Sequence, residues 1–252
     1  MLMISILMPI YNGIEFINES VNSIINQTHT DWELIIGING YQKDSIEYRI
    51  AKEYESLDNR IRVLDMYQLK GKSNTLNAML EHCKYDWISI LDVDDIWFLN
   101  KLENQIPFLD NYDVIGSHCV YFEKMEGVTP KIPFGDISTF DFKSVNPVIN
   151  SSVIIRKSLV NWNQDFDGVE DYDLWLRLRY QNKRFYNVEK VLVKHRIHQT
   201  SAFNSNNQQD KLAKILHNYT IGYKNIDTDK NIDTYNNIDT DNNIDTDNKK
   251  YK

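Results

Sequence analysis

Cysteines, basic clusters and long apolar runs are all scarce in this chain of 252 residues. Two cysteines, Cys83 and Cys119, are too few for a disulfide framework, which fits a reducing, intracellular setting. No stretch is long enough to be a transmembrane segment, and the apolar N-terminus lacks the basic leader and cleavage site of a signal peptide. The net charge of −8 argues against a nucleic-acid partner. We therefore expect a cytoplasmic protein, soluble or peripherally associated with a membrane.

A six-residue repeat, built on N-I-D-T, occupies the C-terminal end of the chain. Each copy offers one isoleucine among polar residues, so the segment cannot bury enough apolar surface to offset the entropy lost on ordering. Hexapeptide repeats can build a β-helix, but such coils need many stacked turns. We expect residues 223–252 to be a low-complexity, disordered tail and residues 1–222 to form the folded domain.

The first half of that domain alternates between two periodicities. Apolar runs typical of strands lie at residues 4–8, 33–38, 62–65 and 87–91, and amphipathic helical segments lie between them at 14–27, 44–57 and 73–83. This order predicts an α/β fold with a mostly parallel central sheet. Asn12 with Glu15 is typical of a capping box, and Ile46, Ile50 and Tyr54 would form the inner face of the second helix.

The second half is less regular. Strands are expected at residues 114–122, 148–156 and 185–194, with a helix at 170–181. In open α/β sheets, ligands bind beyond the carboxyl ends of the strands. Polar residues that directly follow a predicted strand are therefore the first candidates for a site.

Three carboxylates crowd into four positions where the run 87–91 ends, in the order Asp92, Val93, Asp94, Asp95. Such charges repel one another and resist burial, so a compensating charge is expected. Asp92 and Asp94 alternate along an extended backbone, would project the same way and could hold Mg²⁺ or Mn²⁺. Alternatively, Asp94 or Asp95 caps a helix formed by residues 96–106, and both roles can hold at once.

Two further clusters carry titratable groups. Residues 169–180 (VEDYDLWLRLRY) place Glu170, Asp171 and Asp173 in the first turn of an amphipathic helix. The helix dipole alone accounts for carboxylates there, although Asp171 could instead act as a general base in a cleft. In VKHRIHQTS, His198 is either a surface histidine or a single metal ligand that joins the aspartates.

Six motifs, in this order, resemble those of the inverting family 2 glycosyltransferases, which have the GT-A fold. The resemblance runs from about residue 4 to residue 201, and the motifs are SILMPIYNG, SIINQTHTDWELII, GKSNTLNAML, LDVDDIW, VEDYDLWLRL and HRIHQTS. It implies an enzyme that moves a sugar from a nucleotide-diphosphate sugar, with a UDP-sugar favoured, to a hydroxyl of a glycan, lipid-linked or protein acceptor. It also implies single displacement at the sugar and a Mn²⁺ or Mg²⁺ cofactor.

The resemblance assigns roles to individual residues. Asp94, with Asp92 and His198, would bind the metal, while Asp171 would be the base and Glu170 its neighbour. The donor would contact a set of residues that follow the first strands: Pro9, Tyr11, Asn12, Asn39, Gly71, Lys72, Asp92 and Val93. Residues 1–112 would then form the nucleotide-sugar-binding half and residues 113–222 the acceptor side.

One segment departs from the family's pattern. Where the second strand usually ends in V-D-D-G-S, this chain has Ile38 and Asn39 in place of the two aspartates. An asparagine can both donate and accept hydrogen bonds, so the base preference is open. A catalytically inactive, nucleotide-binding relative is therefore an alternative.

Two other enzyme classes fit less well. A nucleotidyltransferase would carry a glycine-rich, basic phosphate loop near its first strand, which residues 5–13 lack. A glycoside hydrolase would use a carboxylate pair without a metal or a diphosphate.

Overall fold

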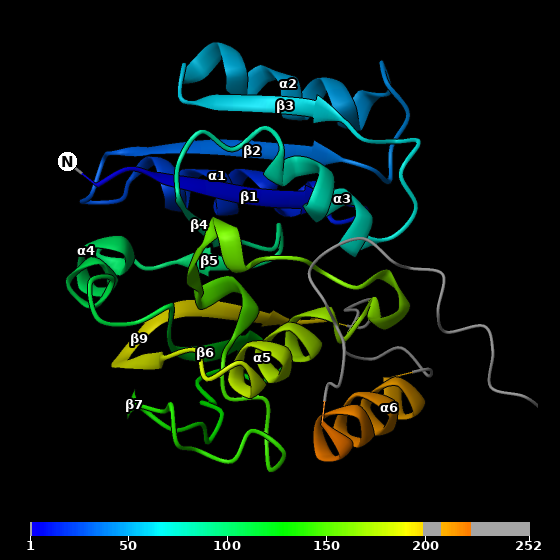
Figure 1. The fold of residues 1–252 in the computed structure, drawn as a ribbon. Coiled ribbons are helices and arrows are strands. Elements are labelled where there is room, and N and C mark those ends of the chain that lie inside the picture. The colour runs from blue at the N-terminus through cyan, green and yellow to red at the C-terminus, as the bar shows by residue number, and fades with distance from the viewer. Residues whose placement is uncertain (1, 199–207, 223–252) are drawn as a thin grey trace, which may run out of the picture.

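The structure, a computed structural model, describes residues 2–198 and 208–222. They form one mixed sheet in the order β3-β2-β1-β4-β8-β6-β9-β5, with β7 paired to β9 (Figure 1). The repeat segment that we expected to be disordered, 223–252, lies outside the described residues. The α/β class predicted from the alternating periodicities is confirmed.

The first half contains every strand and helix expected there. The strands are β1 (Ile4–Ile10), β2 (Trp32–Ile38), β3 (Ile61–Asp65) and β4 (Trp87–Ile90), and the α-helices are α1 (Ile17–Ile25), α2 (Ile46–Leu57) and α3 (Lys72–Leu80). β1 pairs in parallel with both β2 and β4, and β2 pairs in parallel with β3. The carboxyl ends of β1, β2, β3 and β4 therefore meet at one edge of the sheet.

Two cores lie on opposite faces of this sheet. Along β1, Ile6 belongs to the core beneath α1 and α2, whereas Leu7 belongs to the core beneath α3 and α5 (Glu170–Tyr180). Because both faces are covered, the central strands read as continuous apolar runs rather than as alternating patterns.

The second half of the sheet mixes directions. Its strands are β5 (Ile96–Trp97), β6 (Val114–Glu123), β7 (Gly135–Asp136), β8 (Ile154–Arg156) and β9 (Phe185–Ile197). β8 runs antiparallel to β4 and β6, β6 runs parallel to β9, and both β5 and β7 run antiparallel to β9. The first half of the sheet is thus wholly parallel, whereas the second half has one parallel pair, β6 with β9, among antiparallel ones.

The remaining helices are short, apart from one at the C-terminal side. They are α4 (Lys101–Gln105), α6 (Gln208–Ile221) and the 3₁₀ turns η1 (Ile14–Phe16), η2 (Ile106–Phe108), η3 (Asn150–Ser152), η4 (Lys157–Leu159) and η5 (Gln164–Phe166). The sequence analysis did not anticipate α6, which packs against α5. Within the described ranges, no helix is both long and apolar enough to cross a bilayer.

Two predicted helix starts are wrong. Asn12 and Glu15 do not form a capping box, because the chain enters η1 through Gly13, whose φ of 83° suits a glycine, without a side-chain cap. After Asp95 the chain continues into β5 instead of a helix, and α4 begins only at Lys101. The aspartates after β4 therefore cap no helix.

Two other details differ from the expectation. Residues 150–152 form the turn η3, so the predicted strand 148–156 is reduced to β8. Ile46 is 66% exposed, and α2 buries Tyr48, Ala51 and Tyr54 instead. The inner face of α2 therefore runs through Tyr48, Ala51 and Tyr54 and shares only Tyr54 with the predicted face.

Replacing one buried isoleucine in α1 and one exposed isoleucine in α2 tests this arrangement. Ile24→Ala in α1 removes a fully buried side chain and should lower the free energy of unfolding by about 2–5 kcal/mol. Ile46→Ala should change it by less than about 0.5 kcal/mol, because that side chain lies in water. Urea denaturation measures both, and equal losses would contradict the orientation of α2.

Candidate functional site

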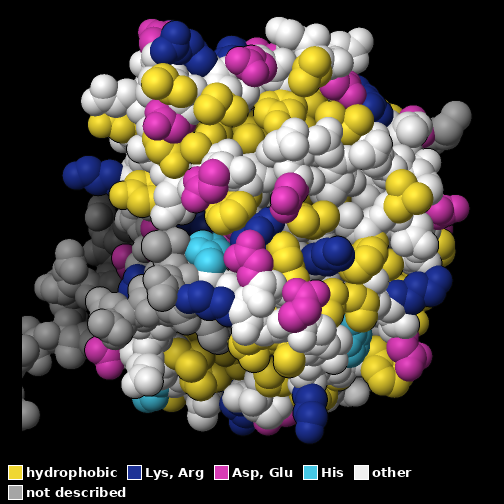
Figure 2. Space-filling model, turned by 180° about the vertical axis from the view of Figure 1, so that it is seen from behind, with side chains coloured by type: hydrophobic (Ala, Val, Ile, Leu, Met, Phe, Trp, Pro, Cys, Tyr) yellow, Lys and Arg dark blue, Asp and Glu magenta, His cyan; other side chains and the backbone are white. Residues whose placement is uncertain are grey.

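A cleft of about 2170 Å³ opens at the edge where the first strands end. Every residue assigned to the site from the sequence lines it, namely Pro9, Tyr11, Asn12, Asn39, Gly71, Lys72, Asp92, Val93, Asp94, Glu170, Asp171 and His198. Figure 2 shows acidic, basic and histidine side chains together near the middle of one face. The cleft exceeds the roughly 300–1,000 Å³ typical of one small ligand, so it has room for two substrates.

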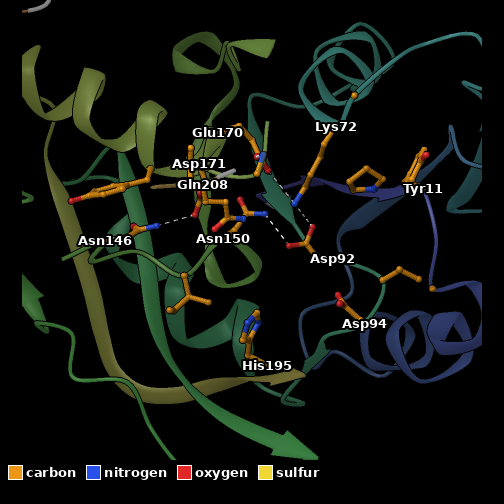
Figure 3. A pocket seen from close by; sticks show the side chains of 18 of the residues that line it. Tyr11, Lys72, Asp92, Asp94, Asn146, Asn150, Glu170, Asp171, His195 and Gln208 are labelled. Carbon is orange, nitrogen blue, oxygen red and sulfur yellow. Dashed lines mark hydrogen bonds and ion pairs between the residues drawn. The ribbon is translucent and has the colours of Figure 1, made fainter. Parts of the chain in front are cut away.

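Lys72 is the cation that faces Asp92. The distance from Lys72 Nζ to Asp92 Oδ1 is 2.7 Å, and Asn150 Nδ2 donates to Asp92 Oδ2 at 3.1 Å (Figure 3). Burial raises the pKa of Asp92, but Lys72 and Asn150 outweigh it and leave the pKa below its ordinary value. Asp92 is therefore ionised, and part of the compensating charge we expected is a lysine.

The same ammonium reaches a second carboxylate. Lys72 Nζ lies 3.3 Å from Glu170 Oε1, and Figure 3 shows Lys72 extending between Glu170 and Asp92. Burial lowers the pKa of Lys72, yet the two carboxylates raise it above its ordinary value, so the side chain stays charged. The other oxygen of Glu170 accepts a hydrogen bond from the Gly168 backbone N–H at 2.6 Å.

Gly71 allows Lys72 to start α3 at this position. Gly71 has a φ of 84°, and a Cβ there would lie 2.0 Å from Asp167 Oδ2. Asp167 Oδ1 accepts a hydrogen bond from the Ser73 backbone N–H at 2.9 Å, at the first turn of α3. Asp167, from the segment before α5, thus accepts a hydrogen bond from an otherwise unpaired backbone N–H at the N-terminus of α3. This contact fixes the backbone from which the Lys72 side chain extends.

Asp94 has a different environment from Asp92. Its Oδ2 lies 2.8 Å from His198 Nε2. Burial, together with Asp95 and Asp92, raises the pKa of Asp94 to about 6, while His198 opposes the shift. The backbone turns here, with the Asp95 N–H donating to the Asp92 carbonyl, so the extended alternation expected for Asp92 and Asp94 is wrong, although both still line the cleft.

Asp95 is fully buried and holds the end of β9. Its Oδ2 lies 3.0 Å from His195 Nδ1, and its Oδ1 accepts a hydrogen bond from the Arg196 backbone N–H at 3.0 Å. His195 is thus half-buried and paired with a buried carboxylate. Burial lowers the pKa of His195, but Asp95, with Asp94 and Asp92, raises it to about 9.

Arg196 adds a second connection between β9 and the turn. Its guanidinium lies between the rings of Phe16 and Phe122, 4.2 and 4.4 Å from their centroids. Its Nε donates to the Asp94 carbonyl at 2.8 Å, and its terminal nitrogens pair with Glu19 and Glu123. Arg196 thus holds the Asp94 carbonyl through its side chain and the Asp95 carboxylate through its backbone N–H.

The carboxylates that open α5 separate into distinct environments. Asp173 is buried and pairs with Arg177 at 2.8 Å, so its role is structural. Asp171 lines the cleft, and its Oδ2 accepts a hydrogen bond from Asn146 Nδ2 at 3.0 Å. Burial and Glu170 raise the pKa of Asp171 to about 6, against the opposing effects of Lys72 and Asn146.

Two asparagines that contact these carboxylates escaped the sequence analysis. Asn146 and Asn150 both lie in the segment before β8, four positions apart, and both line the cleft. Their partners lie 25 and 58 positions away in the chain. Because no local sequence pattern indicates contacts between such distant residues, neither asparagine could be predicted as part of the site.

The side chains around Asp94 fit a divalent metal only in part. Among residues 2–198 and 208–222, no three histidine, cysteine or acidic side chains form a group that could hold a metal. Asp94 and His198 offer one oxygen and one nitrogen beside each other. One carboxylate oxygen and one imidazole nitrogen suit Mn²⁺ better than Mg²⁺, and these two side chains alone would leave a cation incompletely coordinated.

Comparison with known proteins gives a family and a fold. The sequence model of glycosyl transferase family 2 matches residues 5–204. Over 209 residues the chain is 30% identical to UDP-Glc:alpha-D-GlcNAc-diphosphoundecaprenol beta-1,3-glucosyltransferase WfgD of Escherichia coli, covering 79% of this chain and 79% of that protein.

Two solved structures share the fold. TarS 1-349 of S. aureus in complex with UDP-GlcNAc matches with a TM-score of 0.71 and 17% identity, over 87% of this chain and 66% of that chain. Mannosyltransferase PcManGT from Pyrobaculum calidifontis, with GDP-Man and Mn²⁺, matches with a TM-score of 0.62 and 13% identity, over 85% and 68%. The expected GT-A fold is confirmed.

The raised pKa of His195 predicts how stability depends on pH. A group whose pKa is higher in the folded state stabilises that state fully below its unfolded value of 6.5, and the contribution is lost as pH rises through about 9. We expect the His195 ring resonances to titrate near 9 by NMR. Asp95→Asn should bring that pKa down, whereas Asp110→Asn, on the exposed surface, should not. A titration of His195 near 6.5 in the unaltered protein would contradict the Asp95 pairing.

Proposed function

The chain belongs to glycosyl transferase family 2, and we propose that it transfers a sugar from a UDP-sugar to an acceptor hydroxyl by one displacement that inverts the anomeric carbon. It is a glycosyltransferase that uses a nucleotide sugar. One observation carries the finer proposal: Asp92, Asp94 and Asp171, from opposite ends of the domain, converge on one cleft. Carboxylates for the donor and for the acceptor then lie within the same space.

The donor lies, in this proposal, against residues 1–112. Asn39 is 6% exposed at the end of β2, lines the cleft, and its carboxamide makes no hydrogen bond to the residues that the structure describes. It therefore offers both a donor and an acceptor to the edge of a base. The donor named for WfgD, UDP-Glc, supports uridine. Lys72 contributes a fixed positive charge near the diphosphate.

Asp94 and His198, with Asp92 beside them, would hold Mn²⁺ or Mg²⁺. Such an ion supplies Lewis-acid stabilisation of the charge that builds on the leaving diphosphate. Asp92 remains ionised through its contacts with Lys72 and Asn150 and is suited to accept hydrogen bonds from the ribose. The Mn²⁺ complex of PcManGT, which has the same fold, supports a divalent ion in this role.

Asp171 acts as the general base on the acceptor side, residues 113–222. A pKa of about 6 leaves the carboxylate ionised at neutral pH and still basic enough to take a proton from a hydroxyl as attack proceeds. Glu170 holds Lys72 and the Gly168 N–H instead, which makes it a neighbour of the base. The acceptor named for WfgD makes a sugar linked to a lipid diphosphate the first acceptor to test.

An inactive, nucleotide-binding protein is the second candidate. Ile38, which stands where the family's pattern has an aspartate, is fully buried in the core, so no carboxylate can reach the base from that position. Nucleotide binding without transfer to any acceptor would favour this candidate.

Replacing the proposed base separates binding from transfer. Asp171→Asn should lower kcat about 10²–10⁴-fold, because the amide cannot accept the hydroxyl proton, while the donor Kd stays within about twofold. Asp165→Asn, at an exposed carboxylate five residues before α5, serves as the control. Turnover assays with the labelled donor measure both variants, and unchanged turnover in Asp171→Asn would remove it from the mechanism.

Calorimetry tests the donor and the metal together. UDP should bind more tightly than GDP, CDP or dTDP, and its affinity should fall at least about tenfold when Mn²⁺ is chelated, because an ion held by Asp94 and His198 would supply positive charge for the diphosphate. Asp94→Ala should bind UDP equally weakly with and without Mn²⁺. Metal-independent binding in the unaltered protein would contradict the proposed ligand pair.

A further inference from the structure

The base is held by a residue from outside its own helix. We propose that Asn146 is a positioning residue for the transfer reaction, which orients Asp171 and decides which of its oxygens meets the acceptor hydroxyl. This inference rests on the proposed function, because it takes Asp171 as the base.

The orientation of the Asn146 carboxamide follows from its two hydrogen bonds. Its Oδ1 accepts from the Val148 backbone N–H at 3.3 Å, across Pro147, which has no N–H of its own. The amide NH₂ must then point the other way, where it donates to Asp171 Oδ2 at 3.0 Å. A flipped amide would lose both bonds at once, so the donor is fixed toward the carboxylate.

The segment that carries Asn146 is anchored in the core. The Pro147 carbonyl accepts a hydrogen bond from Asn187 Nδ2 at 2.7 Å, and Asn187 is fully buried on β9. Val148 is 1% exposed. Because the backbone on the C-terminal side of Asn146 is tied to the sheet, the carboxamide is held in place before any substrate binds.

The Asn146 amide engages Oδ2 of Asp171, so Oδ1 is the oxygen that lacks this hydrogen bond. Figure 3 shows Asn146 meeting Asp171 from the side opposite to Lys72 and Asp92. With Oδ2 occupied by the amide, Oδ1 is the oxygen that can take the proton of an acceptor hydroxyl. The bond thus selects the reacting oxygen as well as the rotamer of Asp171.

The charges around Asp171 define what the loss of Asn146 would do. Glu170, beside it on α5, and burial favour the protonated acid, whereas Lys72 on α3 and the Asn146 amide favour the carboxylate. The Tyr172 backbone N–H also favours the carboxylate, whereas the Tyr172 hydroxyl donates to the Phe142 carbonyl. A hydrogen bond donated to the carboxylate stabilises its ionised form, so removing the donor must raise the pKa of the base.

Asn150 provides a matched control. It lies in the same segment and also donates to a carboxylate of the cleft, but that carboxylate is Asp92, on the donor side. Asn150→Ala should therefore weaken UDP binding and leave the pH dependence of the chemical step unchanged. A difference between the two asparagines cannot arise from general damage to the segment.

The decisive measurement is the pH profile of kcat at saturating donor and acceptor for Asn146→Ala and Asn146→Asp. Asn146→Asp has the same shape and keeps the acceptor for the Val148 N–H, but it lacks the donor and adds a negative charge. We expect the acidic limb to move up by about one pH unit in Asn146→Ala and further in Asn146→Asp. The UDP Kd should stay within about twofold, and the rate lost at pH 6 should largely return at pH 9.

Asp171→Asn, assayed in parallel, separates this inference from the proposed function. If Asp171→Asn abolishes transfer while both Asn146 variants keep the unaltered acidic limb, or lose rate equally at every pH, the positioning role is overturned and the base stands. If Asp171→Asn transfers sugar at the normal rate, the proposed function itself fails. Should Asn146→Ala lower the melting temperature, the isosteric Asn146→Asp decides, since it preserves the local backbone bond.

Discussion

The ammonium of Lys72 is the interaction on which the cleft depends. It stands between Asp92, which follows β4, and Glu170, which opens α5, so it joins the two halves of the domain through one charge. Without it, two carboxylates would face each other in a partly buried space, where an uncompensated charge is costly. The Asp167 cap on α3 fixes the helix that carries Lys72, and that cap comes from the segment before α5. The turn after β4, the start of α3 and the start of α5 are therefore aligned by reciprocal contacts.

The three aspartates after β4 resolve their repulsion by taking separate partners. Asp92 has a lysine, fully buried Asp95 has His195 and the β9 backbone, and Asp94 faces His198. Burial, together with the two neighbouring aspartates, raises the pKa of Asp94 to about 6, whereas Lys72 and Asn150 hold the pKa of Asp92 below its ordinary value. A divalent ion held by Asp94 and His198, as proposed, would add positive charge beside these aspartates.

Most of this architecture is local enough to be predicted from the sequence, and the exceptions share a cause. Apolar runs of the right length indicate β1 to β4, and the carboxyl ends of parallel strands bring Asn39 and Asp92 together whatever the details of the loops. The helix expected after Asp95 failed because Asp95 bonds to β9, about a hundred positions later in the chain. Asn146 was missed for the same reason. Local periodicity contains no information about a single long-range hydrogen bond, however important that bond is to the chemistry.

The environment of Asp171 shows why these long-range contacts matter. Burial and Glu170 favour the protonated form of Asp171, whereas Lys72 and the Asn146 amide favour its carboxylate. The pKa of about 6 arises because a helix, a loop and a neighbouring carboxylate act on the same group in opposite senses. A general base works best when its pKa lies near the working pH. Lys72 favours the ionised form of Asp171 and also pairs with Asp92, so in the proposed mechanism one positive charge would serve both the donor side and the base.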